Sequence, residues 1–395
     1  MTEKFHELLD QIDKERIYQH IRILEGPRFP LDTMDKLNEA ASYIRDELAK
    51  YGARVVTHGF ILDGVPETFE NIEAHIGDES QPAFCICSHY DSVEFCPGAN
   101  DNLTAVAICL EVIRILIQLP NPPHVIANFF TLEEGHPVFW KKLRELDLKY
   151  SIVNQDFQFT KVKYIEQYRT YVQMMIHARD TGRTLHEGLQ DFIKKFKDSM
   201  SKEELDYYRG IYELYKPYST ETHFGEACLI GSSLWVEKAL DLGLKFSAVI
   251  NYDTVGIIKN SKHTQPFPPI PRFLLRTHKT KFKDHTGNFT CVIGDKNTKK
   301  LYNDFLKVGK EESVDLPYIG FLLPMSFSKI AKVFPAALLS DHTPFWKHDI
   351  PALFLTDTAY LRWDGYHTKS DEAKYLDYEI LAKICKATIA MILRT

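Results

Sequence analysis

Short apolar runs alternate with amphipathic stretches in the first third of the chain. Residues 83–88 (AFCICS) and 125–132 (VIANFFTL) are almost wholly apolar, which is typical of strands buried on both faces. A helical pattern covers residues 102–119 between them and ends at a proline-rich segment. Strand, helix and strand in this order indicate a βαβ unit, and therefore a parallel sheet with helices on its faces.

The same kind of patterning occurs on both sides of this unit. Amphipathic helices are predicted at 3–24 and 35–50, followed by a strand at 54–62. A second set follows in the C-terminal part: helices at 234–242, 299–310 and 378–392, and strands at 246–252 and 352–355. We therefore predict an α/β fold of three layers, with a mostly parallel central sheet between helices.

The stretch from 136 to 225 differs from the rest of the chain. It has no convincing strand pattern, and its apolar residues recur at helical spacing, as in Leu185, Leu189, Phe192 and Phe196. Tyr and Phe are frequent in it, and its acidic and basic residues nearly balance. This segment is predicted to be all-helical.

Composition and charge narrow the class of protein. The chain has 395 residues, 44% of them apolar and 26% charged, which is ordinary for a globular protein. A net charge of −6 argues against nucleic-acid binding, which favours a basic excess. We find no apolar run of about 18 residues that would span a membrane. The charged N-terminus lacks a signal core, so a cytoplasmic location is expected. The seven cysteines are predicted to be free, buried thiols.

Polar residues able to bind metal follow the buried strands. They are His89 and Asp91 after the first strand, Asp101 at the start of the next helix, Glu133 and Glu134 after the second strand, and Asp253 after the strand at 246–252. Ligand sites of such sheets lie at the carboxyl ends of the strands. Carboxylates gathered there repel one another unless a cation neutralises them. Mixed imidazole and carboxylate ligands suit zinc, with manganese or cobalt as alternatives.

Six motifs in a fixed order then point to a family. They are His89-Tyr90-Asp91-Ser92, Pro97-Gly98-Ala99-Asn100-Asp101-Asn102, Glu133-Glu134-Gly135, Asn251-Tyr252-Asp253-Thr254-Val255-Gly256, Ser340-Asp341-His342 and Tyr366-His367-Thr368. The chain resembles the zinc exopeptidases of the bacterial leucyl aminopeptidase type, metallopeptidase family twenty-eight of clan MH. Relatives include glutaminyl cyclases, glutamate carboxypeptidase and the transferrin receptor ectodomain.

The resemblance implies a metal centre with two zinc ions. Asp101 would bridge the two ions. His89 and Asp253 would complete one metal site, and Glu134 and His367 would complete the other.

The remaining site residues are assigned around that centre. The resemblance implies that Glu133 is the general base and that Asp91 orients the ring of His89, a role also expected on physical grounds. Asp341 and His342 would support the site without binding metal. Trp363 and Tyr366, close to His367 in the chain, are candidates for lining the substrate pocket.

The chain departs from the family pattern after the Glu133-Glu134-Gly135 motif. The expected Leu-x-Gly-Ser segment appears only at Leu229-Ile230-Gly231-Ser232. We therefore predict a catalytic domain formed by residues 1–135 and 226–395, with a helical insertion at 136–225. The insertion could be a lid over the cleft, a surface for homo-oligomers or other partners, or a unit simply packed on the body.

The function expected from this resemblance is hydrolysis of the N-terminal residue of peptides by a water activated by two zinc ions. A glutaminyl cyclase is the nearest alternative, but its relatives typically hold one zinc, whereas this chain also keeps His89 and Asp253. A carboxypeptidase or dipeptidase would need a cation for the substrate carboxylate, for which Arg272, Arg276 and Arg362 are candidates. A non-catalytic interaction protein is the remote alternative.

Overall fold

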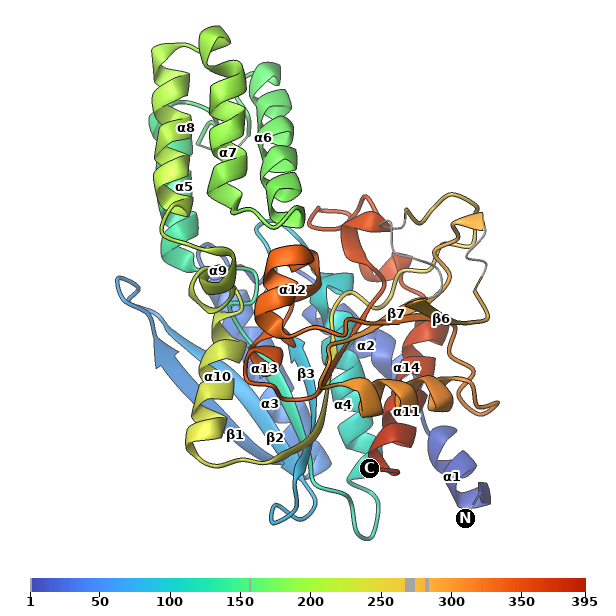
Figure 1. Ribbon diagram of the computed structural model, residues 1–395. Helices are drawn as coiled ribbons and strands as arrows, with labels where there is room; N and C mark the ends of the chain where they lie inside the picture. The colour runs from blue at the N-terminus through green and yellow to red at the C-terminus, as the bar shows by residue number, and fades with distance from the viewer. Residues whose placement is uncertain (1, 156–157, 267–273, 281–283) are drawn as a thin grey trace.

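A computed structural model describes residues 2–155, 158–266, 274–280 and 284–395 of the protein. Within these residues, nine strands form one sheet in the order β1-β2-β4-β3-β5-β9-β7-β8-β6 (Figure 1). The strands are β1 (Arg54–Ile61), β2 (Thr68–Ile76), β3 (Ala83–His89), β4 (Val125–Phe130), β5 (Phe246–Tyr252), β6 (Leu275–His278), β7 (Thr290–Gly294), β8 (Tyr318–Leu322) and β9 (Ala352–Thr356).

The centre of the sheet is parallel. Strands β4, β3, β5 and β9 lie side by side in one direction, as the βαβ pattern predicts. Antiparallel pairings flank them: β1 with β2, β2 with β4, β7 with β9, and β6 with β8. The predicted α/β architecture is confirmed, and the sheet as a whole is mixed.

Helices cover both faces of this sheet. Alternate residues of β3 explain why: Phe84 and Ile86 join one apolar cluster, and Cys85 and Cys87 join the other. The first cluster packs under α2 (Lys14–Leu24), α3 (Met34–Tyr51), α4 (Thr104–Leu116), α11 (Lys299–Gly309) and α14 (Tyr378–Ile392). The second packs under α10 (Ile230–Asp241), α12 (Phe327–Val333) and α13 (Thr343–Lys347).

Some elements differ from the sequence-based expectation. The single helix expected at 3–24 is two helices, α1 (Thr2–Leu9) and α2, because Asp13 begins a new helix by accepting a hydrogen bond from the backbone of Glu15. Strands β2, β6, β7 and β8 were not predicted. β2 carries charged and polar residues that mask its pattern, β6 has only four residues, and β7 and β8 have five each.

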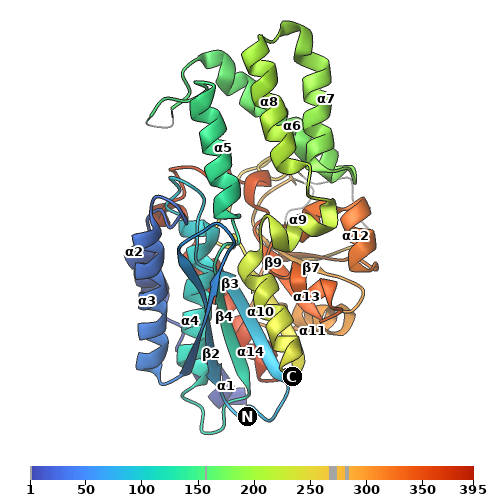
Figure 2. The ribbon, with the colours of Figure 1, turned by 90° about the vertical axis from the view of Figure 1, so that its left-hand side faces the viewer.

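A group of helices stands above the carboxyl ends of the central strands (Figures 1 and 2). It comprises α5 (Pro137–Lys149), α6 (Val162–Asp180), α7 (Leu185–Phe196), α8 (Lys202–Tyr215) and the short α9 (Thr220–Glu226). An apolar cluster of its own includes Tyr171, Phe192 and Tyr208, whose rings lie 4.9–5.9 Å apart. We call α5–α8 the helical bundle.

Two further expectations can be compared with the described residues. All seven cysteines are free, and six of them are buried. Among the residues described, no helix is both long and apolar enough to cross a membrane.

Candidate metal centre

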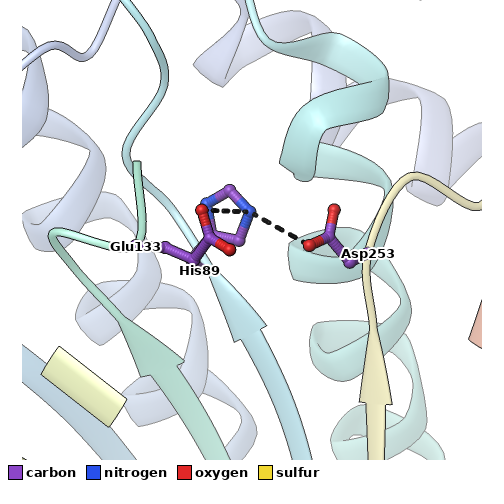
Figure 3. A group of neighbouring side chains, drawn as sticks. All are labelled: His89, Glu133 and Asp253. Atoms are coloured by element: carbon purple, nitrogen blue, oxygen red, sulfur yellow. Dashed lines mark ion pairs between the residues drawn. The ribbon is translucent and has the colours of Figure 1, made fainter. Parts of the chain in front are cut away.

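Three of the singled-out residues meet where adjacent parallel strands end. His89 is the last residue of β3, Asp253 directly follows β5, and Glu133 lies three residues beyond β4. Because β3 lies between β4 and β5, their side chains converge (Figure 3). The Nε2 atom of His89 is 3.9 Å from Oε2 of Glu133 and 3.9 Å from Oδ2 of Asp253.

Asp101 joins this group from a tight turn, Ala99–Leu103, that precedes α4. Its Oδ1 atom lies 3.3 Å from Nε2 of His89, and its Oδ2 atom lies 3.0 Å from Nε2 of His367. His367 comes from a loop after β9 and is also 3.3 Å from Oε2 of Glu134. One carboxylate therefore faces two histidines, and each histidine has further carboxylates beside it.

The donor set fits divalent metal ions. Two groups have ligand atoms within 4.8 Å of one another: His89 with Glu133 and Asp253, and His89 with Asp101 and Glu134. The Nε2 atom of His89 and Oε1 of Glu134 are buried without a hydrogen-bond partner. Buried polar atoms are rarely left in this state, and a bound cation would satisfy them.

We call the polar residues His89, Asp101, Glu133, Glu134, Asp253 and His367 the cluster. The pKa values of its side chains also favour a bound cation. Burial raises the pKa of Glu134 to about 7, and the charge of Asp101 adds to the shift. Burial also raises the pKa of Glu133 well above its ordinary value, and that of Asp253 as well. Although burial lowers the pKa of His367, Glu134 and Asp101 together raise it to about 10. Without a cation the cluster would therefore retain protons, because its carboxylates lie close together.

Asp91 holds the turn that carries the two glutamates. It is buried, and its Oδ1 and Oδ2 atoms accept hydrogen bonds from the backbone N–H groups of Glu133 (3.3 Å) and Glu134 (3.1 Å). Its Oδ1 atom is also 3.5 Å from Nδ1 of His89. One carboxylate therefore contacts three residues of the cluster, a wider role than orienting His89 alone.

Asp341 and His342 lie beneath the cluster rather than in it. Both are fully buried, and burial raises the pKa of Asp341 to about 7 and lowers that of His342 to about 3. The neutral His342 ring pairs through Nε2 with the carbonyl oxygen of Ala337 at 2.8 Å and stacks on Phe354. Ala337 and Phe354, the two residues that His342 contacts, also line an apolar cavity beside the cluster.

An apolar cavity of about 140 Å³ opens beside the cluster and was not anticipated from the sequence. Asp253, a member of the cluster, and Tyr366, next to His367 in the chain, are among the residues that line it. Tyr366 stacks on His367 with ring centroids 3.8 Å apart, whereas Trp363 packs against Tyr375. The apolar lining includes Phe289, Ile293, Ile319, Phe321, Phe334, Ala336, Ala337, Leu339 and Phe354. Many of these come from β7, β8 and the irregular segment after α12, where no motif marks them.

The sequence of the chain is similar to those of known proteins. The model of "Peptidase family M28" matches residues 71–142 and 222–392. The uncharacterized protein YfbL of Escherichia coli is 23% identical over 96% of this chain and 87% of its own length. Aminopeptidase YwaD of Bacillus subtilis is 32% identical, over 23% of this chain and 21% of its own length.

Solved structures share the fold at low sequence identity. Legionella pneumophila LapA aminopeptidase superposes with a TM-score of 0.57 at 16% identity, covering 99% of this chain and 73% of its own. Porphyromonas gingivalis glutaminyl cyclase superposes with a TM-score of 0.55 at 14% identity, covering 97% and 98%. The family model spans more than half of the chain and includes all six residues of the cluster: His89, Asp101, Glu133 and Glu134 in its first segment, and Asp253 and His367 in its second. The protein belongs to peptidase family M28.

Proposed function

We propose that the protein is an aminopeptidase that uses two zinc ions to hydrolyse the N-terminal residue of peptides. The observation that carries this proposal is the pair of histidines on either side of Asp101, each with a second carboxylate nearby. This arrangement offers ligands for two ions that share Asp101. His89 and Asp253 would hold one ion, and Glu134 and His367 the other.

In the proposed hydrolysis, the metal ions, Glu133 and the acidic rim of the cluster have different roles. When bound, a pair of zinc ions supplies a water of lowered pKa and polarises the carbonyl group of the scissile bond. Glu133 is then the general base: it accepts a proton from the attacking water and returns it to the leaving amine. Its raised pKa, caused by burial, suits a group that must both accept and donate a proton. The acidic rim of the cluster favours a substrate with a free, positively charged α-amino group.

The apolar cavity supports a preference for large apolar N-terminal residues. It begins at Asp253 and Tyr366, next to the proposed ions, and its wall is built largely from aliphatic and aromatic side chains. A side chain placed there would leave water for an apolar surface, which favours binding in proportion to the area buried.

The carboxypeptidase alternative finds little support. Arg362 is 5% exposed and donates to Oε1 of Gln265 and to the carbonyl oxygens of Ile257 and Phe289. Its guanidinium also stacks on Phe289. Arg276 lies on the edge strand β6, and Arg272 lies outside the described residues. Arg362 is therefore committed to the protein interior rather than to a substrate carboxylate.

We propose that the helical bundle is a lid over the cleft. On one side, Arg144 of α5 forms ion pairs with Asp32 and Glu94 in the loops next to the site. On the other side, α6 lies against the segment Pro335–Leu338, which forms a wall of the cavity. Gly182, after α6, approaches Lys332 so closely that an added Cβ would lie 1.9 Å from its carbonyl oxygen. Contacts on both sides of the site favour a lid over a free oligomerisation surface.

Mass spectrometry of zinc-loaded protein with two peptides tests the proposed activity. One peptide begins with Leu and the other with Gln. An aminopeptidase removes the first residue of the Leu peptide, and an N-acetylated copy remains intact. Loss of ammonia from the Gln peptide, with the Leu peptide untouched, would instead identify a glutaminyl cyclase.

A further inference from the structure

Asp371, a residue that no motif singled out, makes close contacts with the turn that carries Asp101. It is fully buried. Its Oδ1 atom accepts a hydrogen bond from the backbone N–H of Asn100 at 2.7 Å, and its Oδ2 atom accepts one from that of Asp101 at 3.0 Å. Its own carbonyl oxygen accepts a third from the N–H of Ala99 at 3.1 Å. Three consecutive N–H groups of the turn are therefore bonded to one residue.

The same residue is tied to His367. Only four positions separate them, and the N–H of Asp371 closes a turn on the carbonyl oxygen of Thr368 at 3.1 Å. The hydroxyl of Thr368 in turn donates to the carbonyl oxygen of Gly365 at 2.8 Å. A short, internally bonded loop thus links the His367 backbone to the Asp101 backbone. The side chains of these two linked segments are in contact, with Nε2 of His367 3.0 Å from Oδ2 of Asp101.

A buried cation secures the other end of this turn. Arg28 is 1% exposed, and its guanidinium donates to the carbonyl oxygens of Pro97 (2.8 Å) and Gly98 (3.1 Å), just before Ala99. It also donates to the carbonyl oxygen of Tyr90, between His89 and Asp91, at 2.7 Å. One buried guanidinium therefore bonds to the backbone on both sides of the cluster.

Removing a carboxylate from water is costly unless hydrogen bonds compensate for it. Bonds from backbone N–H groups to an ionised carboxylate are among the stronger ones in proteins, and they fix the donor segment in space. Asp91 holds the N–H groups of Glu133 and Glu134 in the same manner. The two pairs of bonds place candidate ligands from both sides of the cluster.

We propose that Asp371 is a positioning residue for the metal centre, which sets the carboxylate of Asp101 against His367. The inference rests on the proposed function, because it assumes that Asp101 and His367 bind metal. Asp371 itself touches neither metal nor substrate. Asp371 would order the turn that carries Asp101 before metal binds. Without Asp371, metal binding would also have to order this turn, and the affinity for metal would fall.

The test measures zinc affinity of chelator-treated protein by calorimetric titration, for wild type and Asp371→Asn. The Asn side chain has one acceptor oxygen, whereas the two backbone N–H groups need two. Its NH₂ group would face one of these N–H groups, which is also a donor. We expect zinc affinity to fall by about 10–100-fold, the usual effect of losing a partner that orients a ligand.

Asp295→Asn is the matched control. Asp295 is also fully buried, and it accepts hydrogen bonds from the backbone of Asn297 and Thr298, both at 3.0 Å. Asp295 follows β7, which runs antiparallel to β9. It therefore lies at the amino ends of the central parallel strands, whereas the cluster lies at their carboxyl ends. This variant should melt at a lower temperature yet bind zinc like the wild type.

Zinc affinity of Asp371→Asn equal to that of the wild type, with melting lowered as in Asp295→Asn, would overturn the inference and leave the proposed function intact. If Asp371→Asn does not fold, Asp371→Glu decides. It keeps the charge and both acceptors but shifts them by one methylene, so weaker zinc binding is expected and unchanged binding overturns the inference. A wild-type protein that takes up no zinc would refute the proposed function itself.

Discussion

The Nε2 atom of His367 lies 3.0 Å from Oδ2 of Asp101, while the other oxygen of that carboxylate faces His89 at 3.3 Å. Asp101 thus stands between two imidazoles that come from distant parts of the chain. A carboxylate in this position could serve two metal ions at once, and two neighbouring ions can act together on one hydrolytic reaction.

Substitution Glu133→Gln should keep the metal ions and remove catalysis. The amide is nearly isosteric but cannot accept the proton of the attacking water, so we expect kcat to fall by about 10²–10⁴-fold. Zinc content, measured by atomic emission, should match the wild type. Glu237→Gln, at an exposed position of α10, is the control and should be fully active. Near-normal turnover of Glu133→Gln would remove this residue as the base.

Filling the apolar cavity should change substrate preference. Ala336 lines its wall, and Ala336→Phe should compete with a large apolar side chain for the space. We expect kcat/KM for leucyl and phenylalanyl anilides to fall by about 10-fold or more, because side-chain burial in such pockets is worth about 1–3 kcal/mol. The alanyl anilide should be little affected. Val333→Phe, at a position 52% exposed, serves as the control. An equal loss for all three substrates would contradict this use of the cavity.

As a lid over the cleft, the bundle would restrict substrates to short peptides, so removing it should admit longer ones. The N–H of His136 donates to the carbonyl oxygen of Ala227 at 2.8 Å, so the segments that flank the bundle lie side by side. A flexible linker can therefore replace residues 137–218, which contain the whole bundle and leave α9 intact. We expect the ratio of long-peptide to dipeptide cleavage to rise. An unchanged ratio, in a variant with native circular dichroism and zinc content, would refute the lid.

The stability of chelator-treated protein should decrease as pH rises. Burial raises the pKa of Glu134 to about 7, and although burial lowers that of His367, Glu134 and Asp101 raise it to about 10. In the unfolded chain these groups have lower pKa values, so the folded state binds more protons between about pH 5 and 10 and loses stability across that interval. Urea unfolding at about pH 6 and 9 measures the effect.

Zinc should reverse this trend, because metal binding requires deprotonated ligands and so strengthens as pH rises. Glu134→Gln removes one of the titrating groups and should flatten the profile of the chelator-treated protein. A metal-free protein that is more stable at the higher pH would contradict the electrostatic description of the cluster.

Much of the fold follows from periodicity alone. The runs at 83–88 and 125–132 correspond to β3 and β4, because strands buried on both faces are continuously apolar. β2 escaped notice since Glu70, Asn71 and Glu73 interrupt its pattern. Glu73 is buried, but Trp235 and His58 hydrogen-bond its carboxylate. Tertiary partners of this kind cannot be recognised from a local pattern.

Much of the cluster could also be predicted from the sequence. His89, Glu133 and Asp253 follow neighbouring parallel strands, so their meeting is a consequence of topology. Asp371 and Arg28 were missed because their partners are backbone groups of distant segments, and such partners leave no mark in the sequence. The cavity was missed because its walls come from short strands and an irregular segment.

The central claim is tested most directly by titrating zinc into chelator-treated protein while following hydrolysis of leucine p-nitroanilide. A centre that shares Asp101 between two ions predicts that activity appears with added zinc and reaches its maximum at two equivalents per chain. Hydrolysis that is complete at one equivalent, or absent at two, would contradict the account.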